Sequence, residues 1–331
     1  MSPESLIASF AVPGLALAVW CAVVWAPWSA KRWGGKGDEP TKKRAPSCDR
    51  WRIAITALGA LVAFAFSHRA IDGRWPVFPP TLTLNINAWM FYLAIIAALA
   101  SALSAIFAHN WAARTLVRLA ACVSVSAVPV LLLMQGEHSF YNSGFALDPK
   151  SGPLWIAVGA IAAFAWWSAF TPRRLEKSRL PYVLPLGIYV AIAAPTMVLW
   201  TVAINAQFLG ASALALAPAG LIVLWRPHAR IYDALVGFAV LITLAAIVSS
   251  YHFANEYPSP ISAALLALAP LGMFLVRLRA LRPKGAFKRA ALATAIVAVP
   301  AIAGAGIAGY EYSKDAAPTD EDALYEGYYG S

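Results

Sequence analysis

Long apolar runs recur along the chain from residue 6 to residue 310, with short polar connections between them. Each run is close to the roughly 20 residues that a helix needs to cross the hydrocarbon core of a bilayer. Because backbone groups find no water there, runs of this kind must be helical. The pattern therefore predicts an all-α, polytopic transmembrane helix bundle of about ten membrane-spanning helices in residues 1–310, with no soluble domain.

The limits of the apolar runs set the expected helices. They are Leu6–Trp28, Trp51–Ser67, Ile86–Ala108, Thr115–Met134, Leu154–Phe170, Leu180–Val202, Phe208–Trp225, Ile231–Ser250, Ile261–Val276 and Ala290–Tyr310.

Basic residues alternate between the two sides of this predicted bundle. When each connection is counted with the adjoining helix turn, every second one holds all but four of the 26 Lys and Arg residues, the exceptions being Arg69, Arg74, Lys150 and Lys314. Lys and Arg concentrate in cytoplasmic loops. The pattern predicts ten spans with both termini outside, and it is typical of a bacterial inner (cytoplasmic) membrane protein.

Composition supports this interpretation and narrows the partners. Hydrophobic residues make up 60% of the 331 residues and charged residues only 13%, against about 25% charged in soluble domains. The net charge of +10 is explained by topology, so membrane lipids are the expected partners and nucleic acid is not. The three cysteines show no Cys-x-x-Cys spacing, and the sequence indicates no particular cofactor.

Histidines and carboxylates gather on the predicted outer face. His68, His138 and His252 all fall at outer helix ends, and Glu256 follows His252 by one helical turn. Imidazole and carboxylate groups together can bind zinc or copper, which makes these four residues candidate metal ligands. The alternative is an interfacial belt, because aromatic side chains collect at headgroup level.

Two polar segments are candidates for binding lipid or protein. The basic cytoplasmic loop, residues 29–51, includes Lys42, Lys43 and Arg44, which can bind anionic headgroups or serve only as a topology signal. The acidic tail, residues 311–331, is expected to be disordered. Its Tyr325, Tyr328 and Tyr329 suit docking to a partner protein, with idle disorder as the alternative.

Ionisable residues avoid the midpoints of the predicted spans. Asp233 is the closest carboxylate, and it lies in the first turn of its helix, near the cytoplasmic face. Proton-driven pumps place ionisable groups deeper, so that class is disfavoured.

Three functions then remain open. The first is a non-catalytic subunit or scaffold that binds other membrane subunits. The second is a transporter of a neutral or lipid-like substrate, with a cavity near the prolines of its helices and near Thr196 and Ser212. The third is an outward-facing enzyme or metal-binding protein that uses the outer histidines. The lack of a catalytic motif favours the first.

Overall fold

The computed structural model describes residues 12–25, 46–73, 75, 86–134, 151–172, 176, 178–200, 203–225, 230–253, 258–278 and 285–315. Its helices are α2 (Val12–Trp25), α4 (Pro46–Asp72), α5 (Ile86–Ile106), α6 (Trp111–Met134), α7 (Gly152–Phe170), α8 (Leu180–Leu199), α9 (Ala203–Trp225), α10 (Ile231–Phe253), α11 (Pro260–Leu268), the 3-10 helix η2 (Ala269–Arg277) and α12 (Ala286–Asp315).

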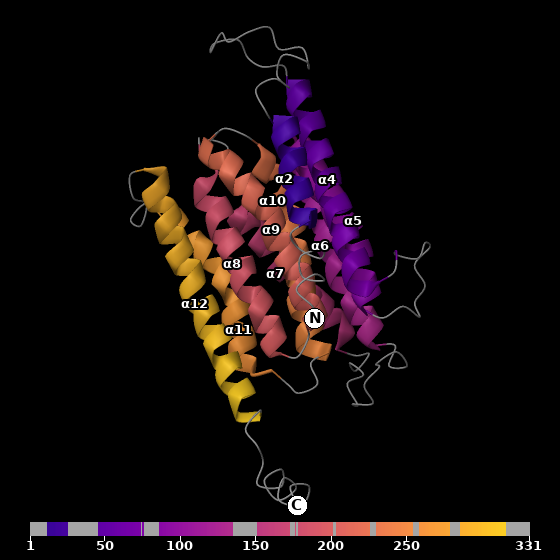
Figure 1. The fold of residues 1–331 in the computed structure, drawn as a ribbon, viewed down its shortest axis with the longest axis vertical. Helices are drawn as coiled ribbons and strands as arrows, with labels where there is room; N and C mark the ends of the chain where they lie inside the picture. The colour runs from indigo at the N-terminus through magenta and orange to yellow at the C-terminus, as the bar shows by residue number, and fades with distance from the viewer. Residues whose placement is uncertain are drawn as a thin grey trace, which may run out of the picture.

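The predicted all-α polytopic bundle is confirmed. The helices lie roughly along one axis and alternate in direction (Figure 1), and the described residues contain no strand. Within the described ranges, eight segments are long and apolar enough to cross a membrane, with α11 and η2 together forming one of them. The predicted number of about ten spans stays a prediction, since it depends on adding α2 and α9 to these eight.

Most helix limits fall within a few residues of those expected, but α4 and α12 are longer. Helix α4 was expected to end at Ser67 and continues to Asp72, where Gly73 adopts a φ of 73° and donates its N–H to the Arg69 carbonyl. This left-handed residue is a common helix terminator. Helix α12 continues to Asp315, so the first residues of the expected acidic tail are helical. The backbone N–H of Ser259 donates to the Glu311 carboxylate there.

Helix α10 is the centre of the bundle. It contacts α4, α5, α6, α7, α8 and α9, and 89% of its apolar span is buried. By contrast, only 28% of the α7 span is buried. A helix that is apolar on all sides is either enclosed by protein or exposed to lipid in a membrane, and α10 is the enclosed case. The Ser101 hydroxyl of α5 donates to the Ala234 carbonyl and accepts the Gly237 N–H, which fixes these two helices together.

The span formed by α11 and η2 changes helix type at Ala269, the residue before Pro270. Proline has no N–H for the carbonyl four residues earlier, which here belongs to Leu266. The Tyr189 hydroxyl donates to that carbonyl at 2.9 Å, and the Trp166 indole N–H donates to the Ala267 carbonyl at 3.0 Å. Side chains of α7 and α8 thus satisfy the carbonyls next to the proline.

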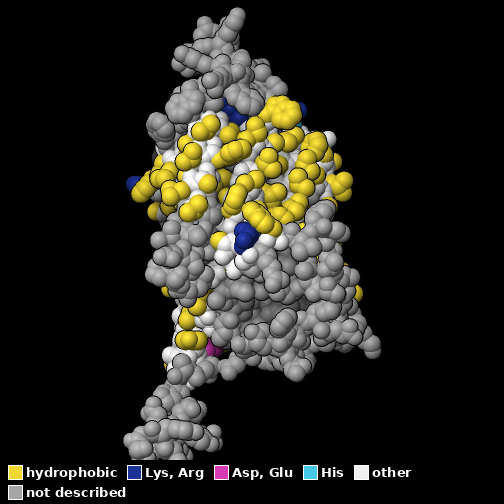
Figure 2. All heavy atoms as spheres, turned by 45° about the vertical axis from the view of Figure 1, so that its right-hand side comes forward, with side chains coloured by type: hydrophobic (Ala, Val, Ile, Leu, Met, Phe, Trp, Pro, Cys, Tyr) yellow, Lys and Arg dark blue, Asp and Glu magenta, His cyan; other side chains and the backbone are white. Residues whose placement is uncertain are grey.

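Apolar side chains cover much of the surface. On the face in Figure 2 they form a continuous area, with Lys and Arg mostly around its margins. Many large apolar side chains are exposed, among them Leu116, Leu154, Ile161, Leu221 and Val299. In a soluble protein such a surface would mark an interface, whereas a helix bundle in a bilayer presents it to lipid tails.

Candidate functional site

A pocket of about 250 Å³ opens at one end of the bundle. We call this end the arginine-rich end, and it is where α6, α8 and α10 begin and where α5 and α7 end. Its lining residues come from all five of these regions, and they are Ser104, Ala105, Ala108, His109, Arg114, Arg118, Thr171, Pro172, Arg179, Arg230, Asp233 and Val236.

The start of α6 positions two of the pocket arginines. The Asn110 side chain accepts the backbone N–H of Ala113 at 3.1 Å, which is the usual bond of an asparagine at a helix N-terminus. The helix then begins at Trp111, so that Arg114 and Arg118 lie four residues apart on one face. Both face the pocket.

Arg118 is the most deeply placed of the pocket arginines, with only 8% of its surface exposed. Its Nε donates to the Ser104 hydroxyl at 2.8 Å, and Nη2 donates to the Thr171 hydroxyl at 3.0 Å. Its guanidinium also lies 4.8 Å from the centre of the Trp167 ring, a distance typical of a cation–π contact. These partners fix the charge of Arg118 in place without neutralising it.

Helix α10 contributes the carboxylate of the pocket. Asp233 lies in the first turn of α10, where a negative charge is favoured by the helix dipole. It pairs with Arg230 at 3.0 Å and with Arg179 at 3.4 Å. Arg230 also donates to the Ala105 carbonyl at the end of α5. Asp233 and Arg230 therefore connect α10 to both α5 and the start of α8.

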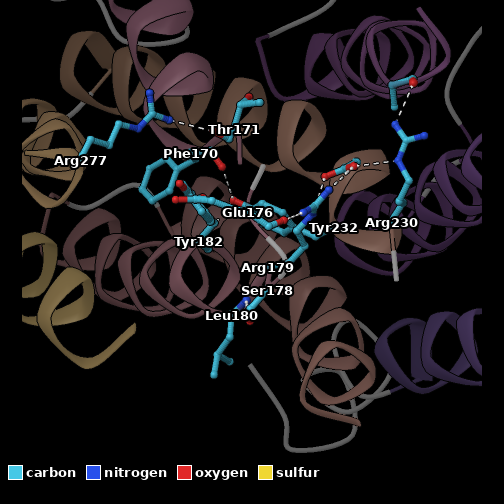
Figure 3. Close-up of polar contacts among 12 residues, drawn as sticks. Phe170, Thr171, Glu176, Ser178, Arg179, Leu180, Tyr182, Arg230, Tyr232 and Arg277 are labelled. Carbon is cyan, nitrogen blue, oxygen red and sulfur yellow. Dashed lines mark hydrogen bonds and ion pairs between the residues drawn. The ribbon is translucent and has the colours of Figure 1, made fainter. Parts of the chain in front are cut away.

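Arg277 and Tyr232 bind the end of α7, next to the pocket residue Thr171 (Figure 3). Arg277 donates to the carbonyls of Ser168, Ala169 and Thr171 at 2.6, 2.8 and 2.8 Å. These carbonyls end α7, where a positive charge is favourable. The Tyr232 hydroxyl lies 3.0 Å from the Phe170 carbonyl and 3.3 Å from that of Tyr182. The two side chains thus fix the end of α7 that carries Thr171.

The charges of the lining determine what the pocket can bind. Four arginines and one aspartate line it, so positive charge is in excess among the described residues. Guanidinium groups match the geometry of carboxylate and phosphate oxygens, to which they donate paired hydrogen bonds. The arrangement is therefore suited to an oxyanion. Among the described lining residues, Asp233 supplies the one carboxylate, so the pocket as described holds no carboxylate pair.

Of the predicted metal ligands, only the His68 side chain lies among the described residues. It belongs to α4 and does not cap it, because the helix continues for another turn. The ring is 1% exposed, stacks on Phe208 at 5.5 Å and meets Phe91 edge-on at 5.9 Å. The sequence predicts His68 on the outer surface, whereas the structure places its ring inside the bundle. The side chain of His252, and all of His138 and Glu256, lie outside the described residues, and the described part of the chain contains no group of three potential metal ligands.

The other predicted binding residues also fall outside the described ranges, namely Lys42, Lys43, Arg44, Tyr325, Tyr328 and Tyr329. The two polar side chains named in the transporter hypothesis, Thr196 and Ser212, lie among the described residues. Thr196 donates to the Ile192 carbonyl and Ser212 to the Phe208 carbonyl, each within its own helix. Neither residue lines the pocket at the arginine-rich end.

The sequence interpretation missed the pocket because it treated its arginines as topology signals. Arg118 lies seven residues inside α6, too deep for a loop residue that only sets orientation. Together with Asp233 on the same predicted side, this depth is a signal that could have indicated a site.

The comparisons with known proteins assign no relative. No protein-family model matches the chain, and no curated protein matches it. The function must therefore be argued from the pocket itself.

Proposed function

We propose that this multi-pass membrane protein binds an oxyanion, a phosphate or a carboxylate, in the pocket at its arginine-rich end. The observation that carries the proposal is Arg118, a buried guanidinium whose hydrogen bonds go to two neutral hydroxyls. Burying a charge is costly unless an opposite charge or several hydrogen bonds accompany it. A bound anion would supply that missing charge.

The other pocket arginines support the same conclusion. Asp233 is shared between Arg179 and Arg230, so one carboxylate offsets two guanidinium groups. Arg114 adds a further positive charge on the same face of α6 as Arg118. Because charge-assisted hydrogen bonds are about twice as strong as neutral ones, an anion that reaches several of these arginines gains most.

The distribution of basic residues supports placing this pocket on the cytoplasmic side of a bacterial inner membrane. The connections at the arginine-rich end are the ones that hold most of the Lys and Arg residues, as cytoplasmic loops do. On this proposal the pocket samples the cytoplasmic solution and the headgroups of the inner leaflet, and both termini lie outside.

The test is isothermal titration calorimetry of the full-length protein in detergent with inorganic phosphate. We expect saturable binding that weakens by about tenfold or more in Arg118→Gln, since hydrogen bonds to charged groups contribute about 1.5–3 kcal/mol. The matched control is Arg50→Gln, because Arg50 is an exposed arginine at the same end of the bundle and does not line the pocket.

Two results would contradict the proposal. One is the absence of saturable phosphate binding together with no binding of a dicarboxylate such as succinate. The other is an equal effect of Arg118→Gln and Arg50→Gln, which would indicate general charge attraction. If Arg118→Gln does not fold, Arg114→Gln takes its place, because Arg114 is only partly buried.

The functions expected from the sequence remain predictions. A scaffold role that uses the basic loop and the tyrosine-rich tail depends on residues outside the described ranges. Oxyanion binding is compatible with that role, since a bound anion can stabilise a subunit interface. For a transporter of a neutral substrate, the arginines at the pocket offer no support.

A further inference from the structure

The pocket extends from the buried Arg118 to the turn between α5 and α6. His109, which lines the pocket, lies in this turn and is exposed. The turn joins the spans Trp89–Ile106 and Trp111–Leu131, so it lies at the depth where a membrane changes from hydrocarbon to headgroups. With both segments spanning a bilayer, the pocket would open at the level of lipid phosphates.

Large apolar side chains are exposed on the outside of the bundle in this turn and on the adjoining helices. Phe107 is 40% exposed, Trp111 76% and Leu116 69%. Tryptophan is enriched at the membrane interface, where its amphipathic ring suits the headgroup region. Leu103, one turn before Phe107, is also exposed. A ligand at this position would touch charged groups at one end and an apolar helix surface at the other.

We propose that the oxyanion is the phosphate of an anionic phospholipid from the adjacent leaflet. The phosphate binds among the pocket arginines, and the acyl chains lie along the outward faces of α5 and α6. This inference rests on the proposed function, because it names the source of the anion that the pocket binds. Net charge matters here: the positive charge of a choline headgroup would meet the same arginines unfavourably.

The apolar surface beside the pocket distinguishes a lipid from a soluble phosphate. Only a ligand with acyl chains gains binding free energy from covering Phe107, Trp111 and Leu116. Inorganic phosphate would reach the arginines and leave these side chains untouched. A substitution on the outer face of α6 therefore separates the two sources.

The experiment is native mass spectrometry of the full-length protein in mild detergent, titrated with palmitoyl-oleoyl phosphatidic acid. Phosphatidylcholine with the same chains is the second probe, and calorimetry with inorganic phosphate is run on each variant. The variants are Arg118→Gln, Leu116→Gln and Leu221→Gln. Leu221 is the matched control, because it is also 69% exposed but lies on α9, away from the pocket.

We expect phosphatidic acid to bind more tightly than phosphatidylcholine. Its affinity should fall about tenfold in Arg118→Gln, through loss of charge-assisted bonds. It should fall roughly threefold in Leu116→Gln, through loss of apolar contact. Phosphate binding should be unchanged in Leu116→Gln, and Leu221→Gln should affect neither ligand.

The other outcomes overturn the inference in two distinguishable ways. If phosphate binds in an Arg118-dependent manner but phosphatidic acid binds no better than phosphatidylcholine, or is as sensitive to Leu221→Gln as to Leu116→Gln, the lipid assignment fails and the oxyanion site stands. If neither phosphate nor phosphatidic acid depends on Arg118 and Arg114, both proposals fail.

Discussion

The two ends of the bundle bury polar side chains in different ways. At the arginine-rich end, Arg118 is buried with its charge, and Asp233 holds two further arginines. At the opposite end, the structure describes a buried cluster of one amide and two hydroxyl groups. The Asn205 amide donates to the hydroxyls of Ser249 and Ser250 at 2.9 Å each, and all three side chains are fully buried.

This difference distinguishes polar groups that bond only within the protein from polar groups that can also bind a ligand. The Asn205 cluster makes its hydrogen bonds within the protein, through the amide N–H groups, and it carries no arginine. A buried guanidinium with neutral partners keeps its charge, so it still attracts an anion. Charged residues at the opposite end, such as Arg69 and Lys314, are exposed. The comparison therefore directs the search for function to one end of the bundle.

The most disruptive test of this comparison places a carboxylate at each end. Asn205→Asp buries a charge beside hydroxyls alone, and we expect a loss of about 3–5 kcal/mol in the free energy of unfolding. Ser104→Asp is nearly as deeply buried but lies beside Arg118, so its cost should be much smaller. Thermal unfolding in detergent measures both. Equal losses would mean that the two ends do not differ in charge. Ser104→Asp should also abolish phosphate binding, because it occupies Arg118.

Removing the Arg277 contacts at the end of α7 should have the next largest effect. Arg277→Met removes the guanidinium donor from the carbonyls of Ser168, Ala169 and Thr171, of which Ser168 keeps the Thr171 N–H. We expect a loss of about 3 kcal/mol in stability, since each unsatisfied buried group costs about 1–3 kcal/mol. Arg277→Lys should recover part of it. A loss below 0.5 kcal/mol, the usual range of surface changes, would show that these bonds contribute little.

A methyl group added at Gly237 tests the contact between α10 and Trp167. A Cβ there would lie 2.3 Å from the Trp167 ring, and this ring also contacts Arg118. Gly237→Ala should cost about 1–3 kcal/mol through overpacking, and it should weaken phosphate binding. Gly59→Ala is the control: its Cβ would meet Trp20 at 2.5 Å, far from the pocket. Its phosphate affinity should match that of the unmodified protein, and an equal loss of affinity in both variants would rule out a role for Trp167.

The smallest effect on stability, and the most informative for binding, is expected from Asp233→Asn. The ion pairs of Asp233 are partly exposed, so their loss should cost about 1 kcal/mol. Phosphate affinity should rise by roughly tenfold, because the pocket loses its own competing carboxylate. Calorimetry decides the result: a fall in affinity would mean that Asp233 positions Arg179 and Arg230 for the ligand.

The sequence predicted the fold well because one physical requirement dominates it. Helices that cross a bilayer must be apolar for about 20 residues, so the start of α5 at Ile86 and the start of α10 at Ile231 were predicted without error. The continuation of α4 past Ser67 was missed, because the residues from His68 to Asp72 are not apolar enough to extend the run. Its end depends on Gly73, which local turn chemistry could have indicated.

The site was much less predictable than the fold. Burial of Arg118 depends on Ser104, Thr171 and Trp167, which come from other helices. Nothing in the sequence states that these helices are neighbours. Asp233 was identified as an unusual carboxylate, but its arginine partner Arg179 lies 54 positions away. A count of charges by loop finds the side on which such residues lie, and only the packing of the helices shows that they converge.

The most direct test of the oxyanion site is a crystal structure of the full-length protein soaked with tungstate, a heavy oxyanion that scatters anomalously. We predict an anomalous peak in the pocket, within hydrogen-bonding reach of Arg118 and at least one of Arg114, Arg179 and Arg230. A tungstate that binds only to exposed Lys and Arg side chains, with the pocket empty at saturating concentration, would contradict the assignment of this site.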